Sequence, residues 1–197
     1  MREVDAIAYV RRGVWWIVLV VLVVFFGCPD SGFAQTGFSQ VGSLKRSPAD
    51  IVKRYVRLDF KGARLDAMGF DVLAPYINWK EEPVWGQIVI IQGSEVAEDY
   101  RKWEIIDNLD VIIPVTFQVR GVVDMRTAVF TPDERTEEVR FHVTAVRNNW
   151  RIVGPVVPPH IGVTRMVNFA REAGIHEKDD ERRGVLAVLE GSLRKAK

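Results

Sequence analysis

The feature that most limits how this chain can fold is a period-two alternation of apolar and polar residues within residues 115–120 and 139–145. The apolar members are Val115, Phe117, Val119, Val139, Phe141, Val143 and Ala145. Because successive side chains of a strand point to opposite faces, each set must lie on one face of a half-buried sheet. We predict that both sets face the helices and share a core with Tyr55 and Val56. The opposite face is expected to be wet or to form a dimer contact, and it carries Gln118, Arg120, Arg140 and His142.

Further strand and turn signals surround these two segments. We predict strands at 84–92, 95–106, 111–123 and 150–153, a turn at 107–110, a charged loop at 131–134 and a hairpin turn at 148–149. The hairpin turn is assigned to Asn148 and Asn149 because asparagine tolerates the positive φ of such turns. After residue 157 the chain is expected to leave the sheet, since Pro158 and Pro159 have no N–H to donate to a ladder.

Helical periodicity occurs on both sides of the strands. Before them, Ser47 can cap a helix, Pro48 suits its first position and Asp50 can bond back to the cap. We expect that helix to end at Gly62. Its apolar stripe is Ile51, Val52, Tyr55, Val56 and Phe60, and a second helical stretch at 65–76 carries Leu65, Met68, Val72 and Leu73. After the strands we expect helices at 163–173, with Met166, Val167, Phe169 and Ala170 inward, and at 179–195, with Val185, Leu186, Leu189 and Leu193 inward.

The N-terminus has a different composition. Residues 14–26 carry no charge, Arg11 and Arg12 precede them, and residues 32–34 read Gly-Phe-Ala. This is the order of a secretory signal peptide, with cleavage before Gln35. The apolar run is short for a spanning helix, which needs about 20 residues. We predict an exported protein, periplasmic or extracellular. Retention of the segment as a membrane anchor is the alternative, and it is the only membrane contact we expect.

Cys28 is the only cysteine of the chain and leaves a third possibility for the N-terminus. Gly27-Cys28 resembles the end of a bacterial lipobox, which would make Cys28 a lipidation site, although the preceding Phe25-Phe26 departs from that pattern. Because Cys28 is the only cysteine, the domain that follows it has neither an internal disulfide nor a cysteine nucleophile. We divide the chain into a signal or membrane segment at 1–34, a flexible linker at 35–46, an α+β domain at 47–161 and a C-terminal helical extension at 162–197.

Charge and motif content argue against several classes of function. The formal net charge is +1, and basic residues are scattered among acidic ones, so the sequence has no basic stripe for nucleic acid. Phosphate-binding loops, dinucleotide fingerprints and nucleophile elbows are absent from the sequence. The three histidines are too dispersed for a recognisable metal motif. We therefore expect no metal, no cofactor and no nucleic-acid partner.

Two segments together resemble the nuclear transport factor 2-like superfamily. They are the Ser-Pro-Ala-Asp helix start at 47–50 and the final hairpin Val-Thr-Ala-Val-Arg-Asn-Asn-Trp-Arg-Ile-Val at 143–153. The resemblance covers residues 47–161. It implies an α+β fold in which N-terminal helices pack on a strongly curved antiparallel sheet, a cone with a pocket inside, here with extra C-terminal helices. The superfamily includes ketosteroid isomerase, scytalone dehydratase and many domains that only bind or dimerise, so the resemblance implies a fold rather than a function.

Catalytic members of that superfamily place a carboxylate or histidine base opposite a tyrosine or an acid. The residues of this chain with suitable chemistry are Tyr55, Asp59, Asp71, Tyr76, Tyr100, Asp124 and His142. No spacing singles out a pair, so we assign no catalytic residue. We interpret His142 as a solvent or dimer-face residue, Tyr55 as a core residue with a satisfied hydroxyl and Asp59 as a solvated helix-end carboxylate. A pocket role is the alternative for each, and His160 is expected to be a loop residue at the pocket mouth.

Aromatic residues gather in the sequence where the strands begin. They either line an apolar ligand pocket or fill the core. The ligand-pocket candidates are therefore Tyr55, Asp59, Tyr76, Trp79, Trp85, Tyr100 and Trp103. We predict a non-enzymatic extracytoplasmic domain that binds an apolar or amphipathic small molecule, or pairs with itself or a partner through the outer sheet face. The alternative is a cofactor-independent enzyme of the isomerase or dehydratase kind, acting on an apolar small molecule in the cone.

Overall fold

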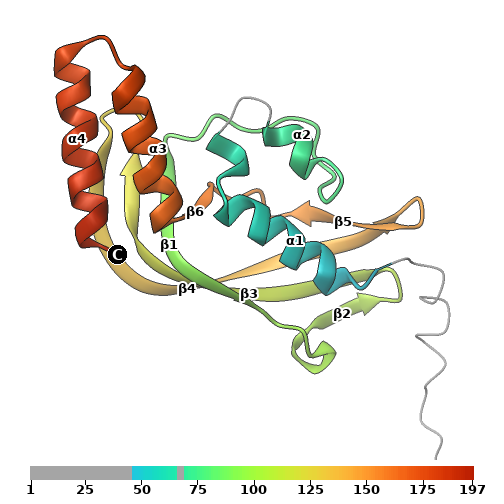
Figure 1. Cartoon of the computed structure of the whole chain (residues 1–197). Coiled ribbons are helices and arrows are strands. Elements are labelled where there is room, and N and C mark those ends of the chain that lie inside the picture. The colour runs from blue at the N-terminus through green and yellow to red at the C-terminus, as the bar shows by residue number, and fades with distance from the viewer. Residues whose placement is uncertain (1–45, 66–68) are drawn as a thin grey trace, which may run out of the picture. The chain divides into compact units, whose positions relative to one another are not determined.

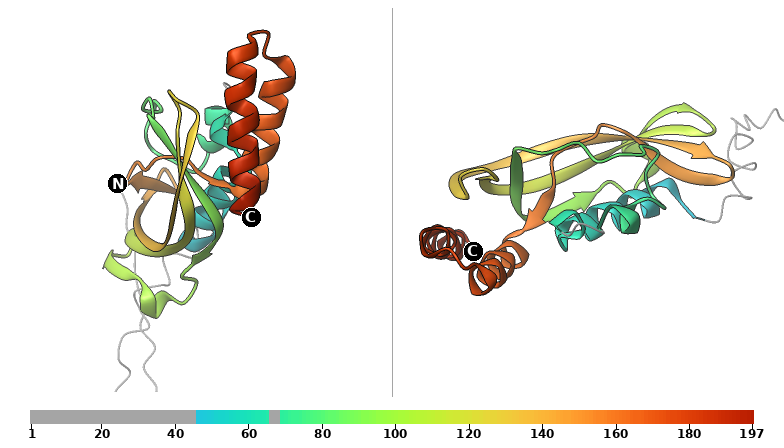
Figure 2. Two further views of the ribbon diagram at one scale, coloured as in Figure 1. Left: turned by 90° about the vertical axis from the view of Figure 1, so that its left-hand side faces the viewer. Right: turned by 90° about the horizontal axis from the view of Figure 1, so that it is seen from above.

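A curled six-stranded sheet forms the body of the domain in the computed structural model, which describes residues 46–65 and 69–197. The strands run in the order β5-β4-β3-β1-β6, and β2 pairs with β3 outside this path. Their bounds are β1 (Gln87–Val96), β2 (Glu104–Asp107), β3 (Asp110–Asp124), β4 (Val129–Val146), β5 (Asn149–Gly154) and β6 (His160–Gly162). The long strands β3 and β4 bend so strongly that the sheet becomes a half-barrel (Figures 1 and 2). The fold class is therefore α+β, as expected.

Four α-helices accompany the sheet in the described part of the chain. They are α1 (Pro48–Phe60), α2 (Gly69–Leu73), α3 (Val163–His176) and α4 (Asp180–Lys195), with short 3₁₀ turns η2 (Ala63–Leu65) and η3 (Tyr100–Lys102). The predicted start of α1 is confirmed: the Ser47 side chain accepts from the Ala49 N–H, and Asp50 accepts from the Ser47 N–H. Gly62, with φ of +82°, turns the chain after the helix. At the other end of the chain, α3 and α4 lie side by side beyond one end of the sheet (Figure 2).

None of the described helices is long and apolar enough to cross a bilayer. The apolar run at 14–26, the cleavage site before Gln35 and the lipidation candidate Cys28 all lie outside the described residues. Met68 of the second helical stretch lies outside them as well.

Two apolar cores lie on opposite faces of β1. The first lies between α1 and the inner face of the sheet, and it contains Tyr55, Val56, Phe117 and Phe141 together, so the predicted register of the alternating strands is confirmed. The Tyr55 and Phe141 rings meet edge to face with centroids 5.7 Å apart. The second core joins the far face of β1 to the last two helices, and its members include Ile88, Ile90, Met166, Val167, Leu189 and Leu193. Val185 was expected inward, but it is 39% exposed.

Two expectations about the sheet are wrong. The sheet is mixed rather than antiparallel, because β6 pairs with β1 in parallel after the two prolines. Residues 131–134 are not a loop but part of β4, and the turn that precedes them lies at 125–128. Pro132 is tolerated in this strand because it lies opposite Gly121 at a bulge. A side chain at Gly121 would meet the Thr131 carbonyl oxygen at 2.3 Å, so that position requires glycine.

Three local boundaries also differ from the sequence interpretation. The last hairpin turns one residue earlier, at Arg147 and Asn148, which carry φ of +50° and +61°, while Asn149 already pairs with Val146. The predicted strand at 95–106 is interrupted by η3 and divided between the end of β1 and β2. Among the described residues of the stretch at 65–76, Leu65 ends η2 and the only α-helix is the short α2, which begins at Gly69; Val72 in it is 50% exposed.

Candidate functional site

The most concentrated polar cluster of the described chain surrounds Arg64 of η2. Its guanidinium is 2% exposed and donates two hydrogen bonds to the carboxylate of Asp59, of 2.9 and 2.6 Å. It also donates to Glu82 at 2.9 Å and to the carbonyl oxygens of Val157 at 2.8 Å and Pro158 at 3.1 Å. These bonds use the five N–H donors that a guanidinium has. Arg64 thus ties the end of α1 to the segment before β6 and to the chain before β1.

Asp59 is not the solvated carboxylate that we expected, because it is only 2% exposed. Besides Arg64, it accepts the backbone N–H of His160 at 2.9 Å. Both carboxylate oxygens are therefore engaged, one by Arg64 and the other by Arg64 and His160 together. The pair fixes the first residue of β6 against α1, where β6 can pair with β1.

His160 is a buried residue of β6 rather than a loop residue, and it is 2% exposed. Its Nδ1 lies 2.7 Å from the carbonyl oxygen of Pro158, and its ring lies on that of Phe117 with centroids 4.4 Å apart. The neighbouring carbonyl oxygen requires the proton to be on Nδ1, so Nε2 carries the lone pair. Nε2 is buried and has no hydrogen-bond partner among the described residues. Burial lowers the pKa of His160, against the attraction of Asp59.

Tyr55 lies in the core, as expected, but its hydroxyl has no hydrogen-bond partner in the described chain. Its ring lies under the guanidinium of Arg64, with 5.8 Å between the guanidinium carbon and the ring centroid, and meets Trp79 edge to face. Burial raises the pKa of the Tyr55 hydroxyl, and the positive charge of Arg64 opposes this only partly. Burial likewise acts against the charge of Arg64, but the hydrogen bonds and charge of Asp59 outweigh it and raise the pKa of the guanidinium. The cluster therefore holds a fixed cation and a neutral phenol.

The other pocket candidates lie apart from one another. Trp79 is half-buried beside Tyr55, and Trp103 packs at the rim of the same core while its indole N–H donates to the Ala97 carbonyl oxygen at 2.6 Å. The Trp85 indole donates to Glu82 at 2.6 Å, which connects it to the Arg64 cluster. Tyr100 is 54% exposed. Tyr76 lines a separate small cavity of about 260 Å³.

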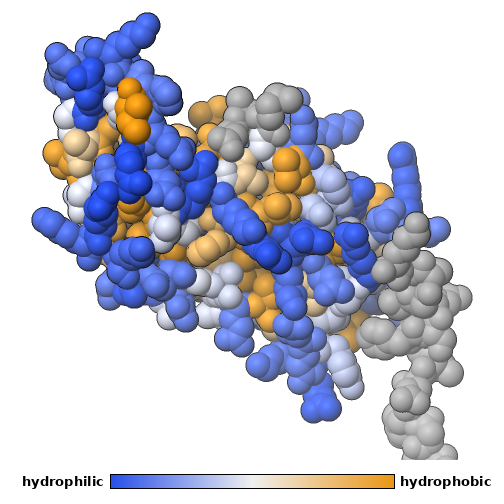
Figure 3. All heavy atoms as spheres, in the orientation of Figure 1, coloured by the Kyte–Doolittle hydropathy of each residue, from blue (hydrophilic) through white to orange (hydrophobic). Residues whose placement is uncertain are grey.

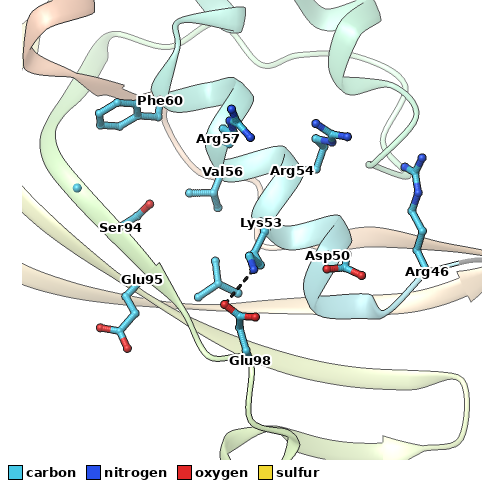
Figure 4. A pocket seen from close by; sticks show the side chains of 12 residues that line it. Arg46, Asp50, Lys53, Arg54, Val56, Arg57, Phe60, Ser94, Glu95 and Glu98 are labelled. Carbon is cyan, nitrogen blue, oxygen red and sulfur yellow. Dashed lines mark ion pairs between the residues drawn. The ribbon is translucent and has the colours of Figure 1, made fainter.

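A larger hollow lies elsewhere, between α1 and the second half of β1, and we call it the α1–β1 groove (Figure 4). It has a volume of about 800 Å³ and is open to solvent. Its polar lining is Lys53, Arg54 and Arg57 from α1, Ser94 and Glu95 from β1, and Glu98 just after β1. Val56 and Phe60 of α1 add apolar surface. Figure 3 shows strongly hydrophilic side chains along this face with apolar ones beside them.

The charges of the α1–β1 groove are unevenly neutralised. Lys53 pairs with Glu98 at 2.9 Å, across the groove (Figure 4). Arg54 and Arg57 are exposed, and neither forms an ion pair with another described residue. Arg46 lines the same groove near the start of α1. The groove therefore presents positive charge that the described part of the domain does not neutralise.

We predicted no binding role for the residues that line this groove: Asp50, Val56 and Phe60 were given only structural roles in the first helix, and Arg64 was not singled out. A signal for the groove was present in α1, where the basic residues follow the polar side of the apolar stripe. No signal for the Arg64 cluster was present locally, since its partners Val157, Pro158 and His160 lie far along the chain. His142, expected on the outer face, is partly exposed and contacts Asp110 there. Within residues 46–65 and 69–197 no group of acidic, histidine or cysteine side chains is placed to hold a metal ion.

Comparison with known proteins finds no family model, no curated protein and no solved structure that matches this chain.

Proposed function

We propose that this protein is an extracytoplasmic, non-enzymatic binding domain of the nuclear transport factor 2-like type, and that it holds its ligand or partner in the α1–β1 groove. The observation that carries the proposal is the contrast in hydrogen bonding between the two candidate sites. Arg64 has no N–H left for a ligand, and both oxygens of Asp59 are occupied. Arg54 and Arg57 stand in an open groove without an ion-pair partner in the described residues.

The interior of the curled sheet supports the same proposal. Its inner face is filled by Phe117, Phe141 and Tyr55, each at most 2% exposed. A ligand in that interior would have to displace well-packed aromatic side chains, at a cost of several kcal/mol. The groove requires no such displacement, because it is already open, and its mixture of apolar and cationic side chains fits an amphipathic ligand with negative charge.

Site-specific photo-crosslinking in the native cell envelope tests the proposal. A photoreactive amino acid replaces Arg57 in the groove and, as the matched control, Arg126, an exposed arginine in the β3–β4 turn. We expect a crosslinked product from position 57 and none from position 126, and we expect Arg54→Glu to abolish it. Equal crosslinking from both positions, or crosslinking that Arg54→Glu leaves intact, would contradict binding in the groove.

A cofactor-independent enzyme of the isomerase or dehydratase kind is the second candidate. It is favoured by two unpaired buried atoms close to Asp59, the Tyr55 hydroxyl and Nε2 of His160. These are the groups that proton transfer to an apolar substrate would use. A substrate screen tests it: a turnover that Tyr55→Phe and His160→Asn abolish, and that Arg54→Glu does not change, would place function in the interior instead. Dimerisation through the outer sheet face stays a prediction, to be checked by analytical ultracentrifugation.

A further inference from the structure

One wall of the α1–β1 groove is a sheet edge that carries no strand in the described chain. On one side, β1 pairs with β3 from Gln87 to Val96. On the other side, β6 covers only Val89 to Ile91. Strand β6 ends at Gly162 because the chain enters α3 at the next residue, Val163. Residues 92–96 of β1 therefore have a free edge, and this edge faces the groove.

The backbone groups of Ser94 and Val96 point out of this edge. The Ala97 N–H donates to the Pro114 carbonyl oxygen of β3 at 3.0 Å, so the hydrogen-bonding groups of residue 97 face β3. Along an antiparallel pair, consecutive residues direct these groups alternately to the two sides. Glu95 thus bonds toward β3, and the N–H and C=O groups of Ser94 and Val96 face the groove. An open row of this kind is a template for another strand.

The free edge is long enough to pair with one short added strand. Residues 92–96 span about 16 Å at the usual rise per strand residue, and the groove volume is about 800 Å³. Phe60 marks one end, because its ring packs against Gly162 so closely that a β-carbon there would lie 2.6 Å from it. Toward the other end the groove is lined by Asp50 and Arg46 (Figure 4).

The charges that line the groove determine which side chains an added strand should carry. Asp50 is engaged in the cap of α1, and Glu98 is paired with Lys53. The charges without an ion-pair partner in the described chain are those of Arg46, Arg54 and Arg57 against Asp50 and Glu95, because a hydrogen bond to a backbone N–H does not neutralise the Asp50 carboxylate. Every second side chain of an added strand would point to the α1 side of the sheet, where these arginines stand. Carboxylates at alternate positions would therefore be matched.

We propose that the α1–β1 groove binds an extended acidic peptide of a protein partner, which adds a strand to the free edge of β1 at Ser94 and Val96. Backbone hydrogen bonds to this edge supply affinity, and the arginines of α1 select carboxylates at alternate positions. This inference rests on the proposed function, because it names the class of ligand for the same groove.

The probe is a capped peptide of alternating glutamate and valine, added to the full mature protein. Residue-resolved amide hydrogen exchange by NMR is the measurement. We expect the peptide to slow exchange at Ser94 and Val96 by at least about tenfold and to leave Glu95 unchanged, because the Glu95 amide already bonds to β3. Protection of Ser94 and Val96 in the protein alone would overturn the proposal, since the edge would then be covered by the chain itself or by a second copy. No added protection with the peptide would overturn it too.

Two matched pairs separate backbone recognition from charge. Ser94→Pro removes the outward N–H without touching the β3 ladder, and an edge strand tolerates it, whereas Ser94→Ala keeps the N–H. We expect the Kd to rise about tenfold in Ser94→Pro and to stay unchanged in Ser94→Ala. If Ser94→Pro does not fold, a peptide N-methylated on its β1-facing amides makes the same test on the unaltered protein. A lysine–valine peptide should bind at least about tenfold more weakly; equal binding of it, or of the N-methylated peptide, would overturn the proposal.

The failure of this inference can be told from failure of the proposed function. If the photo-crosslink from position 57 forms and needs Arg54, yet Ser94 and Val96 gain no protection from the peptide, the groove binds something other than an added strand. If neither crosslink nor protection is observed, both proposals fall.

Discussion

Arg57 lies in the last turn of α1 and Arg64 lies just after the helix, and the two arginines differ in burial and in hydrogen bonding. The side chain of Arg64 is 2% exposed and gives all its guanidinium donors to the protein. Arg57 is exposed in the α1–β1 groove and forms no ion pair within the described chain. A buried charge has to be satisfied from within, because water cannot reach it. An exposed charge carries no such requirement and stays available for something outside the molecule.

The largest expected effect comes from removing the buried arginine. Arg64→Met leaves Asp59 as a buried charge without its partner, which typically destabilises a protein by about 3–5 kcal/mol. Arg57→Met, the matched change in the groove, should alter the free energy of unfolding by no more than about 0.5 kcal/mol. Denaturant midpoints measure both. Adding Asp59→Leu to Arg64→Met should restore part of the loss, and equal effects of the two single changes would mean that water reaches the cluster.

Truncating an aromatic side chain should also cost more unfolding free energy in the buried interior than in the α1–β1 groove. Phe141 is fully buried between α1 and the sheet, so Phe141→Ala should cost about 3–5 kcal/mol of unfolding free energy. Phe60, at the end of the groove, is only half-buried, so Phe60→Ala should cost clearly less. Chemical denaturation of both variants gives the comparison. A larger loss for Phe60 would show that the end of the groove, rather than the interior, limits stability.

A smaller effect is expected at the cap of α1, the helix that forms one wall of the groove. Ser47→Ala removes the acceptor for the Ala49 N–H and should lower the free energy of unfolding by about 1 kcal/mol. Ser192→Ala in α4 is the control, because this serine bonds back within its own helix and caps nothing. A thermal unfolding series detects the difference. Equal midpoints for the two variants would mean that α1 does not depend on this cap.

The smallest effect is a dependence on pH. Burial lowers the pKa of His160, so the folded state binds a proton less readily than the unfolded state. Stability should therefore fall as pH drops through the ordinary range of histidine, about 6.5. His160→Asn should reduce this fall relative to the wild type, measured by urea unfolding between about pH 8 and about pH 5. His176→Asn, at an exposed histidine, should follow the wild type.

The parts of the fold that have a local period could be predicted from the sequence. The strands around Phe117 and Phe141 alternate because one of their faces is buried, and the cap at Ser47 has a fixed spacing. The start of β4 was missed because residues 131–136 are exposed on both faces and therefore have no alternation. The three-residue β6 was missed because it follows two prolines and is too short to show a pattern.

The candidate site was harder to predict because it depends on contacts between distant residues. Asp59 was judged by its place near the end of a helix, where carboxylates are usually solvated. Its burial depends on Arg64, in a 3₁₀ turn without periodicity, and on His160, whose backbone reaches it only through the tertiary fold. The free edge of β1 likewise results from the early end of β6, which no local sequence signal announces.

The bond from His160 to Asp59 joins residues separated by 101 positions, and it sets the order in which the domain can be completed. A chain growing from its N-terminus places Asp59 and Arg64 long before their last partners exist. Until residue 160 has been made, the Arg64 cluster lacks the backbone groups of Val157, Pro158 and His160 that complete it, and β1 lacks its parallel neighbour. Closing so long a loop is also slow. The domain therefore cannot reach its complete fold until most of its chain has been made.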